Sequence, residues 1–464
     1  MAVRVAVVGG GAAGMAAASR AKRMLGDRAE VVVFEKGSWV SFALCGTPYY
    51  IGCRVRRLDD LLYYPPEEFT RRRGIRVMLR TLVTELEPGE GRLRYRSLST
   101  GEEGWYEYDY LVLATGARPR VLGEWLRYRN VYTLHSLGDA DRVRAAAVRD
   151  DVRRIVVIGG GYTGVEAAEN LAGLGRRVTI IHRRGWLLNR MLDEDMKGLV
   201  EERARAAGVE LVLGRRVEGL EGSGDLAVSA VLDNGERVGG DLFIVAGGIE
   251  PAADIAEKAG IRLGETGAVW TDERMRTSVD NVYAVGDVAE TRDLVTGGRV
   301  WWPFAPAANK MGYVAGTNIA GGDARFPGVV RTSAVGAFGF YVAATGLGEE
   351  EARRHGFNPV AARLKARTRA HYMGGEEIVL KVVADADTGR LLGAQAVSGD
   401  PSGFWRVNVV ASLLYKGATV WDLFGVDVGY WPGLNPVWDP LTVAARLLFR
   451  QLGAAPPKPE DKGG

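Results

Sequence analysis

The chain is poor in cysteine and histidine, and it contains no long apolar run. Its 464 residues include two cysteines and four histidines. Two cysteines exclude a framework of stabilising disulfides and favour a thiol with a chemical role. No uninterrupted apolar stretch reaches the length that spans a bilayer, so we expect no membrane partner. A strand pattern already begins at Val3 and leaves no room for a signal sequence, so we expect a cytoplasmic location.

Positive and negative charges nearly balance along the chain. The formal net charge is +3 at pH 7, which is too small to indicate a nucleic-acid partner. We also expect no metal site. A chain of 464 residues is too long for one hydrophobic core, so the length predicts two or three domains.

A glycine-rich turn near the N-terminus lies between a strand pattern and a helix pattern. A β-branched run precedes residues 9–14 (GGGAAG), and an alanine-rich segment follows them. Glycines let the backbone approach a pyrophosphate, whose charge is attracted by the free amides at the helix start. A second strand ends in Glu35, about 20 residues after Gly14, where a carboxylate can bind ribose hydroxyls. These features predict a dinucleotide-binding fold.

The same pattern occurs again at residues 154–181, with a second glycine turn at 159–164 (GGGYTG). One position differs, because His182, Arg183 and Arg184 stand where the first copy has Glu35. Cationic donors there suit a ribose 2′-phosphate better than a free hydroxyl. We therefore predict that NADPH is preferred, with NADH possible. A solvated loop face is the alternative interpretation of the two arginines.

A third motif identifies a family. Residues 277–287 (TSVDNVYAVGD) end in Gly286 and Asp287, and residues 110–116 (YLVLATG) form a further strand and turn. With the two glycine turns, they make the chain resemble the FAD-dependent pyridine nucleotide–disulfide oxidoreductases from about Val3 to Phe449. The resemblance implies an α/β fold with two Rossmann-like dinucleotide-binding domains, for FAD and NAD(P), and a C-terminal α+β dimerisation domain. It places the FAD domain at 1–117 and 250–325, the NAD(P)H domain at 118–249, the dimerisation domain at 326–450 and a disordered tail at 451–464.

The resemblance also implies which residues hold the two cofactors. Asp287 falls where relatives contact the ribityl chain of FAD, while Tyr162 and Glu166 flank the nicotinamide. The residues that the resemblance assigns to FAD are Gly9, Gly11, Ala12, Ala13, Gly14, Glu35, Lys36, Val83, Ala114, Thr115, Gly116, Gly286, Asp287 and Ala305. Those assigned to the nicotinamide cofactor are Gly159, Gly161, Tyr162, Thr163, Gly164, Glu166, His182, Arg183, Arg184 and Gly248.

Cys45 is the candidate for the reacting thiol. Its surroundings, residues 41–50 (SFALCGTPYY), resemble the single-cysteine branch of the family, which includes coenzyme A disulfide reductases, NAD(P)H oxidases and NAD(P)H sulfur reductases. We expect the start of a short helix and an oxidised flavin to stabilise its thiolate. Cys53 is too far along the chain for the dithiol arrangement of other relatives. We interpret it as a structural thiol, and an internal bridge to Cys45 stays open.

The substrate side is predicted from the same resemblance. Arg20, Arg23, Ser41, Arg73 and Asn309 fall where the coenzyme A branch contacts coenzyme A or flavin. Each arginine alone is equally consistent with a solvated helix face. Two further residues, Tyr372 and Tyr430, match tyrosines that the partner subunit of a homodimer contributes to a shared active site. We expect them to stabilise the departing thiolate, with core packing as the alternative. Leu44 and Trp438 depart from the branch pattern.

These features lead to one functional hypothesis with alternatives. The chain is predicted to use FAD and NAD(P)H to reduce coenzyme A disulfide through Cys45, with coenzyme A as substrate or as a mixed disulfide. An NAD(P)H oxidase that reduces O₂ and a reductase of elemental sulfur or polysulfide share the motif. A non-enzymatic alternative is a redox-switched flavoprotein that binds a partner through its C-terminal tail and its tryptophan-rich C-terminal region. We interpret the tryptophans at 405, 421, 431 and 438 as dimer core. The physiological acceptor and assembly beyond a dimer stay open.

Overall fold

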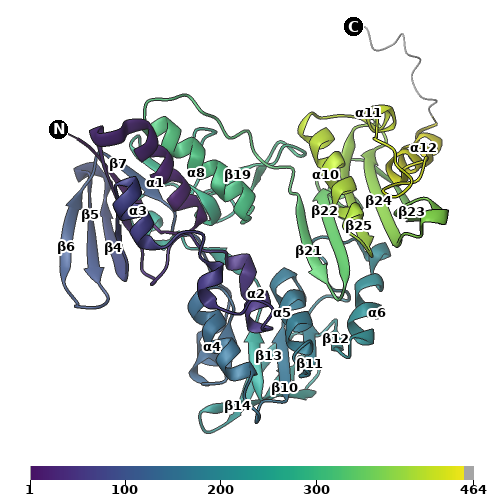
Figure 1. The fold of residues 1–464 in the computed structure, drawn as a ribbon, viewed down its shortest axis with the longest axis horizontal. Helices are drawn as coiled ribbons and strands as arrows, with labels where there is room; N and C mark the ends of the chain where they lie inside the picture. Colours follow the sequence, from purple (N-terminus) through teal and green to yellow (C-terminus); the bar gives the residue numbers. More distant parts are fainter. Residues whose placement is uncertain (1, 454–464) are drawn as a thin grey trace.

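The chain folds into three lobes, and the computed structural model describes residues 2–453 (Figure 1). The first domain is built on five parallel strands in the order β18-β7-β1-β2-β3. Other elements cover both faces of this parallel sheet, so the residues of its strands are almost all apolar. The strands are β1 (Val3–Val8), β2 (Ala29–Phe34), β3 (Ile75–Met78), β7 (Tyr110–Leu113) and β18 (Val282–Ala284).

Two long helices cover one face of this sheet and lie side by side (Figure 1). They are α1 (Ala12–Leu25) and α8 (Ala305–Ile319), far apart in sequence. Glycine permits the close approach, since a Cβ added at Gly312 would lie 2.3 Å from the Ala13 carbonyl oxygen. An antiparallel sheet of β4 (Thr81–Glu87), β5 (Arg92–Ser97) and β6 (Glu103–Glu107) covers the other face. Smaller elements are η1 (Gly26–Arg28), η3 (Leu58–Leu61), α3 (Pro66–Arg73), η4 (Pro88–Glu90), α7 (Asp254–Lys258), η7 (Gly286–Val288), β19 (Thr291–Arg292) and β20 (Arg299–Val300).

The second domain repeats the first architecture. Its parallel sheet has the order β12-β11-β10-β16-β9, and an antiparallel sheet of three strands lies beside it. A short pair of strands, β8 (Ala117–Pro119) with β17 (Ile249–Pro251), forms the double crossing between the first two domains. The remaining elements are η5 (Gly123–Arg127), β9 (Val131–Thr133), α4 (Leu137–Ala147), β10 (Arg154–Ile158), α5 (Tyr162–Ala172), β11 (Arg177–His182), η6 (Glu194–Met196), α6 (Leu199–Ala206), β12 (Glu210–Leu213), β13 (Val217–Ser223), β14 (Leu226–Leu232), β15 (Arg237–Gly239) and β16 (Leu242–Val245).

The third domain is an antiparallel sheet in the order β21-β22-β25-β24-β23, with helices packed on it. The predicted fold class, two Rossmann-like domains followed by an α+β domain, is therefore confirmed. The elements are β21 (Ser333–Ala337), β22 (Phe340–Gly346), α9 (Glu349–Arg354), β23 (Pro359–Arg367), η8 (His371–Met373), β24 (Glu377–Asp385), β25 (Leu391–Ser398), α10 (Ser402–Tyr415), α11 (Val420–Gly425) and α12 (Pro440–Leu452).

The start of the predicted tail is part of α12. This helix ends at Leu452 and is closed by Gly453 in the left-handed conformation, which an L side chain adopts only at a cost. The Gln451 side chain donates a hydrogen bond to the Ala361 carbonyl oxygen. Residues 451–453 are therefore ordered, which corrects the tail boundary of 451. Residues 454–464 lie outside the described part of the chain.

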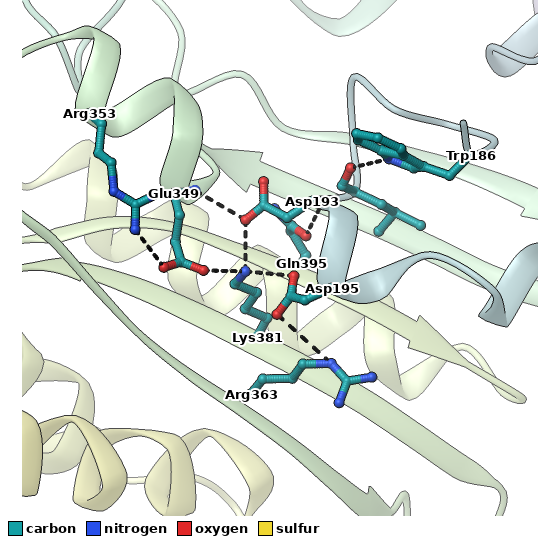
Figure 2. A network of polar contacts seen from close by, with 9 residues as sticks. Trp186, Asp193, Asp195, Glu349, Arg353, Arg363, Lys381 and Gln395 are labelled. Carbon is teal, nitrogen blue, oxygen red and sulfur yellow. Dashed lines mark hydrogen bonds and ion pairs between the residues drawn. The ribbon is translucent and has the colours of Figure 1, made fainter. Parts of the chain in front are cut away.

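A buried lysine joins the second domain to the third (Figure 2). The Lys381 ammonium of β24 is 1 % exposed and lies 2.9, 2.7 and 2.6 Å from carboxylate oxygens of Asp193, Asp195 and Glu349. The two aspartates come from the second domain, and Glu349 begins α9 of the third. Burial opposes the charge, but the three carboxylates outweigh it and raise the pKa of Lys381. The network fixes the second domain against the third.

The third domain also has an exposed apolar surface. Trp405, Trp431, Leu434, Val437 and Trp438 are each more than half exposed. The fourth tryptophan predicted for the dimer core, at position 421, instead packs on Phe449 inside the protomer, with ring centroids 5.3 Å apart. Within residues 2–453, no helix is both long and apolar enough to cross a membrane. Exposed aromatic residues at this density are typical of a surface that a second protein covers.

Candidate active site

The two glycine turns have the same geometry. Gly9 and Gly159 have φ of +110° and +122°, a conformation that glycine adopts without strain. A Cβ at Gly9 would lie 2.1 Å from the Ala114 carbonyl oxygen, and a Cβ at Gly159 would lie 2.2 Å from that of Ala246. The helices that follow begin with no side-chain cap, at Gly11 and Gly161. Their first amides are thus free to bind a pyrophosphate, so both turns fit a dinucleotide.

The loops that follow β2 and β11 are also equivalent. Ser41 and Leu188 both have φ of +54°, which is unusual for residues other than glycine. Their amides donate to the carbonyl oxygens of Gly10 and Gly160, over 2.9 and 2.8 Å. The first loop continues to Cys45, and the second continues to Leu192 at the matching position. The loop that carries the thiol is therefore held over the first glycine turn by its own backbone.

The residues that begin these two loops differ in charge. Glu35 accepts hydrogen bonds from the amides of Gly10 (2.7 Å) and Gly37 (2.5 Å), which orient its carboxylate at the turn. In the second domain the Gly160 amide donates to Nδ1 of His182 over 3.1 Å. His182 is buried, and this burial lowers its pKa. Nδ1 of His182 accepts here, so the cationic donors predicted for this segment are Arg183 and Arg184, which are exposed as a pair.

Asp287 provides the test of whether the first domain fits FAD. Burial raises the pKa of this carboxyl to about 6. Among residues 2–453 no hydrogen bond is donated to this half-buried carboxylate, so its oxygens are open to a ligand hydroxyl. Other residues assigned to FAD are placed nearby by the fold: Ala114, Thr115 and Gly116 follow β7, Gly286 adjoins Asp287, Ala305 starts α8, Val83 is buried in β4, and Lys36 follows Glu35 and is exposed. The residues present fit a flavin dinucleotide.

Cys45 lies in a short turn, η2 (Leu44–Gly46), that leads into α2 (Thr47–Ile51). The residue is exposed, and neither cysteine is in a disulfide. Partial burial of the thiol raises its pKa, and the nearby carboxylates of Glu166 and Asp287 raise it further. The helix start does not by itself lower the pKa of this thiol, so the predicted stabilisation of the thiolate depends on the flavin. The structure does bring Cys45 into the electrostatic range of both Asp287 of the first domain and Glu166 of the second.

Glu166 is a second carboxylate at this junction with a raised pKa. It lies on α5 of the second domain, and burial raises its pKa to about 7. The Tyr49 hydroxyl, on α2 of the first domain, donates to its Oε1 over 3.2 Å and partly offsets the effect of burial. Burial and this carboxylate together raise the pKa of Tyr49 to about 12. A carboxyl that titrates near neutral pH beside a cysteine is typical of an active site.

We predict that Tyr49→Phe raises the pKa of Glu166 further. The hydroxyl stabilises the ionised carboxylate, so its loss favours the protonated form, and the effect is expected to be roughly one pH unit. The measurement is the pH dependence of flavin reduction by the nicotinamide under anaerobic conditions. An ionisation near pH 7 should move upward in the variant. An unchanged pH profile would show that the ionisation of Glu166 does not control flavin reduction.

Tyr162 is held at the junction of all three domains. Its hydroxyl donates to Oγ of Ser333 in the third domain over 2.9 Å. Its ring packs edge-on against Phe304, just before α8 of the first domain, with centroids 5.5 Å apart. Burial raises the pKa of the phenol. The Tyr162 ring thus lies between the two domains that carry the glycine turns. A nicotinamide reaching from the second domain toward a flavin in the first would have to pass this ring.

The residues predicted to bind substrate form part of an aromatic and cationic surface on the first domain. Arg20 stacks on Tyr313, with its guanidinium carbon 4.2 Å from the ring centroid, and donates to Thr317. Arg73 stacks on Tyr64 at 4.3 Å. Stacking of this kind leaves guanidinium N–H groups available to a phosphate. Ser41 is held by the backbone contact described above, and Arg23 and Asn309 are exposed on α1 and α8.

Tyr372 and Tyr430 lie together in the third domain. They line a cavity of about 390 Å³ with Trp438, and every lining residue belongs to residues 366–438. A hydrogen bond with Tyr372 raises the pKa of Tyr430, which makes it a poorer acid. No residue of the Cys45 loop lines this cavity. A single chain therefore does not bring the tyrosines to the thiol.

Two contacts between domains were not predicted. Tyr49 stands in the motif around Cys45, but its bond to Glu166 depends on how two domains pack. Lys381 lies in a run of apolar strand residues, which is an unusual place for an ammonium group and the one available signal. Asn170, on α5 behind Glu166, lies within 2.6 Å of where a Cβ of Gly52 would be, so the thiol loop packs tightly on the second domain.

Comparison with known proteins identifies the family. The model of the pyridine nucleotide-disulphide oxidoreductases matches residues 3–312, and the model of the family's dimerisation domain matches residues 332–440. The chain belongs to this family. The protein is therefore a flavoprotein of the FAD-dependent NAD(P)H oxidoreductases. It has Rossmann folds and a C-terminal dimerisation domain.

Three similar proteins carry names that describe related activities. The NAD(P)H coenzyme A polysulfide/persulfide reductase of Pyrococcus horikoshii is 45% identical over 96% of this chain and 98% of its own. An NADH oxidase of Methanocaldococcus jannaschii is 32% identical over 97% and 99%. Among solved structures, a NAD-dependent persulfide reductase from A. fulgidus has a TM-score of 0.93 and 38% identity, over 97% of this chain and 84% of that one. The predicted single-cysteine branch of the family is confirmed by these names.

Proposed function

We propose that this flavoenzyme uses NADPH to reduce a sulfur–sulfur bond in a coenzyme A-linked substrate, either a persulfide, a polysulfide or coenzyme A disulfide. The observation that carries the proposal is the exposed Cys45 thiol, within electrostatic range of Glu166 and Asp287 from two dinucleotide domains. The relative named as a coenzyme A polysulfide/persulfide reductase supports the first two substrates. Leu44 and Trp438 depart from the pattern of the coenzyme A disulfide reductases. We therefore rank coenzyme A disulfide below the persulfide and the polysulfide as a substrate.

The residues around the first glycine turn would hold FAD. Free amides at the start of α1 would bind the pyrophosphate, Glu35 would bind ribose, and the Asp287 carboxylate would accept from a ribityl hydroxyl. FAD held there would supply the transfer of two electrons from the nicotinamide to sulfur, and an electron-poor ring near Cys45 would favour the thiolate that the protein alone disfavours. Glu166 and Tyr162 orient the nicotinamide side of the junction.

Cys45 carries the sulfur chemistry. Its thiolate attacks the coenzyme A sulfur of the substrate, which forms a Cys45–coenzyme A mixed disulfide and releases HS⁻ from a persulfide or a thiolate from a disulfide. Two electrons and one proton then convert the mixed disulfide to the Cys45 thiolate and free coenzyme A thiol. Coenzyme A persulfide and coenzyme A disulfide thus give the same intermediate on the protein.

A second subunit completes the site. Tyr372 and Tyr430 would reach the partner's Cys45 and donate hydrogen bonds to the departing thiolate. Stabilisation by hydrogen bonding is the role we assign, because the raised pKa of Tyr430 makes proton transfer unfavourable. The exposed Trp405, Trp431 and Trp438 supply the apolar area that such a homodimer buries.

An NAD(P)H oxidase is the second candidate. The relative named as an NADH oxidase is 32% identical over nearly the whole chain. In that chemistry Cys45 would cycle through a sulfenic acid and a thiolate. The identity to the persulfide reductase relative is higher at 45%, which favours a sulfur acceptor.

The test is a comparison of acceptors under identical conditions. NADPH oxidation is followed without oxygen, using coenzyme A persulfide, coenzyme A disulfide, polysulfide and glutathione disulfide, and then in air without a sulfur acceptor. We expect kcat/KM for the coenzyme A-linked acceptors to exceed that for glutathione disulfide by at least roughly a hundredfold, since the latter lacks the nucleotide that Arg20 and Arg73 would bind. Faster turnover in air than with every sulfur compound would contradict the proposal and favour the oxidase.

A further inference from the structure

The loop that carries the reactive thiol belongs to the first domain by sequence and to the second domain by packing. This thiol segment, residues 39–62, runs between β2 and β3 of the first sheet. Its buried side chains Ile51 and Leu61 nevertheless share one hydrophobic cluster with Val143 of α4 and Leu171 of α5, both in the second domain. Figure 1 shows α2 beside these two helices. The second domain therefore provides the core on which the thiol segment folds.

Helix α4 also holds the thiol segment through polar contacts. The Tyr50 hydroxyl donates to Oδ1 of Asp141 over 2.9 Å. Arg144 of the same helix places its guanidinium carbon 4.3 Å from the centroid of the Tyr50 ring. Its Nη1 donates to the carbonyl oxygens of Val55 and Arg56, over 3.2 and 2.9 Å. An arginine that stacks on a ring and donates to two backbone oxygens has a fixed orientation, and it fixes the backbone in turn.

Helix α5 contacts the same segment. The Tyr49 hydroxyl donates to Glu166 over 3.2 Å, and Arg54 lies 3.8 Å from Glu169 of the same helix. Helix α2 has five residues, which is too short for a helix to be stable in water by itself. The geometry of α2 is therefore imposed by its contacts with α4 and α5.

The position of Cys45 depends on the position of α2. Cys45 lies in η2, which continues directly into α2 at Thr47. The Thr47 hydroxyl donates to the Leu44 carbonyl oxygen over 2.8 Å and joins the two turns. A Cβ at Gly46 would lie 2.3 Å from Cδ2 of Leu61, so the backbone beside the thiol packs on the far end of the segment. A displacement of α2 would therefore move the thiol.

We propose that Asp141 and Arg144 are positioning residues for the Cys45 thiol, so that the second domain orients the reacting sulfur as well as binding the nicotinamide nucleotide. Both residues act through Tyr50 and the backbone that follows α2. The inference rests on the proposed role of Cys45 in reducing a sulfur–sulfur bond. Attack on sulfur requires the thiolate to be aligned with the bond that breaks, so a small displacement slows this step. Hydride transfer from the nicotinamide to a flavin does not use the thiol and should be unaffected.

Cys53 reports how firmly the thiol segment is held. It is half-buried, and it lies in the chain between Tyr50 and Val55, two residues that Arg144 contacts. We expect iodoacetamide to label Cys53 roughly tenfold faster in Arg144→Met, because the side chain becomes accessible when the segment opens. The labelling rate is measured on the Cys53 peptide by mass spectrometry, and it requires no turnover.

Two further variants make this readout specific. Arg142→Met is the matched control, because Arg142 is exposed on the same helix and pairs with Asp139 over 2.7 Å. Its replacement should leave the labelling of Cys53 unchanged. Tyr50→Phe removes only the hydroxyl that bonds to Asp141, so it tests the same contact if the arginine variant does not fold. We expect labelling in Tyr50→Phe to be roughly threefold faster than in the unmodified enzyme.

The kinetic readout compares the two half-reactions. In Arg144→Met we expect kcat/KM with coenzyme A persulfide to fall roughly tenfold, while flavin reduction by NADPH without an acceptor stays within about twofold. An equal loss in both half-reactions, or unchanged labelling of Cys53, would overturn the inference. An unmodified enzyme that reduces its flavin but turns over no sulfur acceptor would overturn the proposed function instead, and the labelling of Cys53 would still test the hold on the segment.

Discussion

Cys45→Ser is expected to reduce turnover with every sulfur acceptor by at least about a thousandfold while FAD stays bound. A serine hydroxyl remains protonated at neutral pH and cannot attack a sulfur–sulfur bond as a thiolate does. The flavin contacts that we assign, Glu35, Asp287 and the turn at Gly9, lie outside this side chain. The measurement is steady-state NADPH oxidation, with flavin content determined on the same sample.

Cys53→Ser is the matched control for that variant. Cys53 has φ of +60° and is half-buried after α2, and it has no disulfide partner. We expect its replacement to leave turnover within a few-fold of the unmodified enzyme. Equal loss in both variants would indicate a two-cysteine mechanism. Unchanged turnover in Cys45→Ser would remove Cys45 from the chemistry altogether.

Lys381→Met is expected to give the largest loss of stability among single substitutions in the third domain, about 3 kcal/mol at neutral pH. Methionine keeps the volume but leaves Asp193, Asp195 and Glu349 facing one another, with oxygen atoms within 4.8 Å. In the unmodified protein the ammonium contributes its full stabilisation below the pKa of an unfolded lysine. Since folding raises that pKa, the contribution is lost only as pH rises through the higher, folded value.

The measurement is denaturant unfolding, monitored by tryptophan fluorescence. Trp186 lies on the loop that leads to Asp193, and its indole donates to the Leu192 carbonyl oxygen (Figure 2). Lys365→Met serves as the control. Lys365 is exposed and lies 3.5 Å from Glu377, so its loss should cost less than about 1 kcal/mol. A similar small effect in both variants would mean that the interdomain network contributes little to stability.

The sequence predicted those parts of the site that depend on local backbone chemistry. At Gly9 and Gly159 the turns combine a positive φ with a close approach to a carbonyl oxygen that leaves no room for a Cβ, so their role is readable from residue type. Asp287 and Cys45 were predicted because each lies in a local motif, and the structure brings both to one junction. The equivalence of the two domains was also visible in the repeated order of strand, turn and helix.

The sequence did not predict what depends on how domains pack. The bond between Tyr49 and Glu166 joins two domains, and no spacing in the chain indicates it. The contacts of His182 with the Gly160 amide and with Asn189 Oδ1 likewise depend on the path of the loop, which residue type does not indicate. Lys381 likewise required the three carboxylates of two domains to be placed around it.

The most direct test of the account is the mass of the enzyme after incubation with coenzyme A disulfide and no reductant. A mixed disulfide on Cys45 is the intermediate that the mechanism requires from every coenzyme A-linked substrate. We predict one coenzyme A per chain, located on the Cys45 peptide, absent from Cys45→Ser and released by one equivalent of NADPH. An adduct on Cys53 only, an internal bridge between Cys45 and Cys53, or no adduct at all would contradict it.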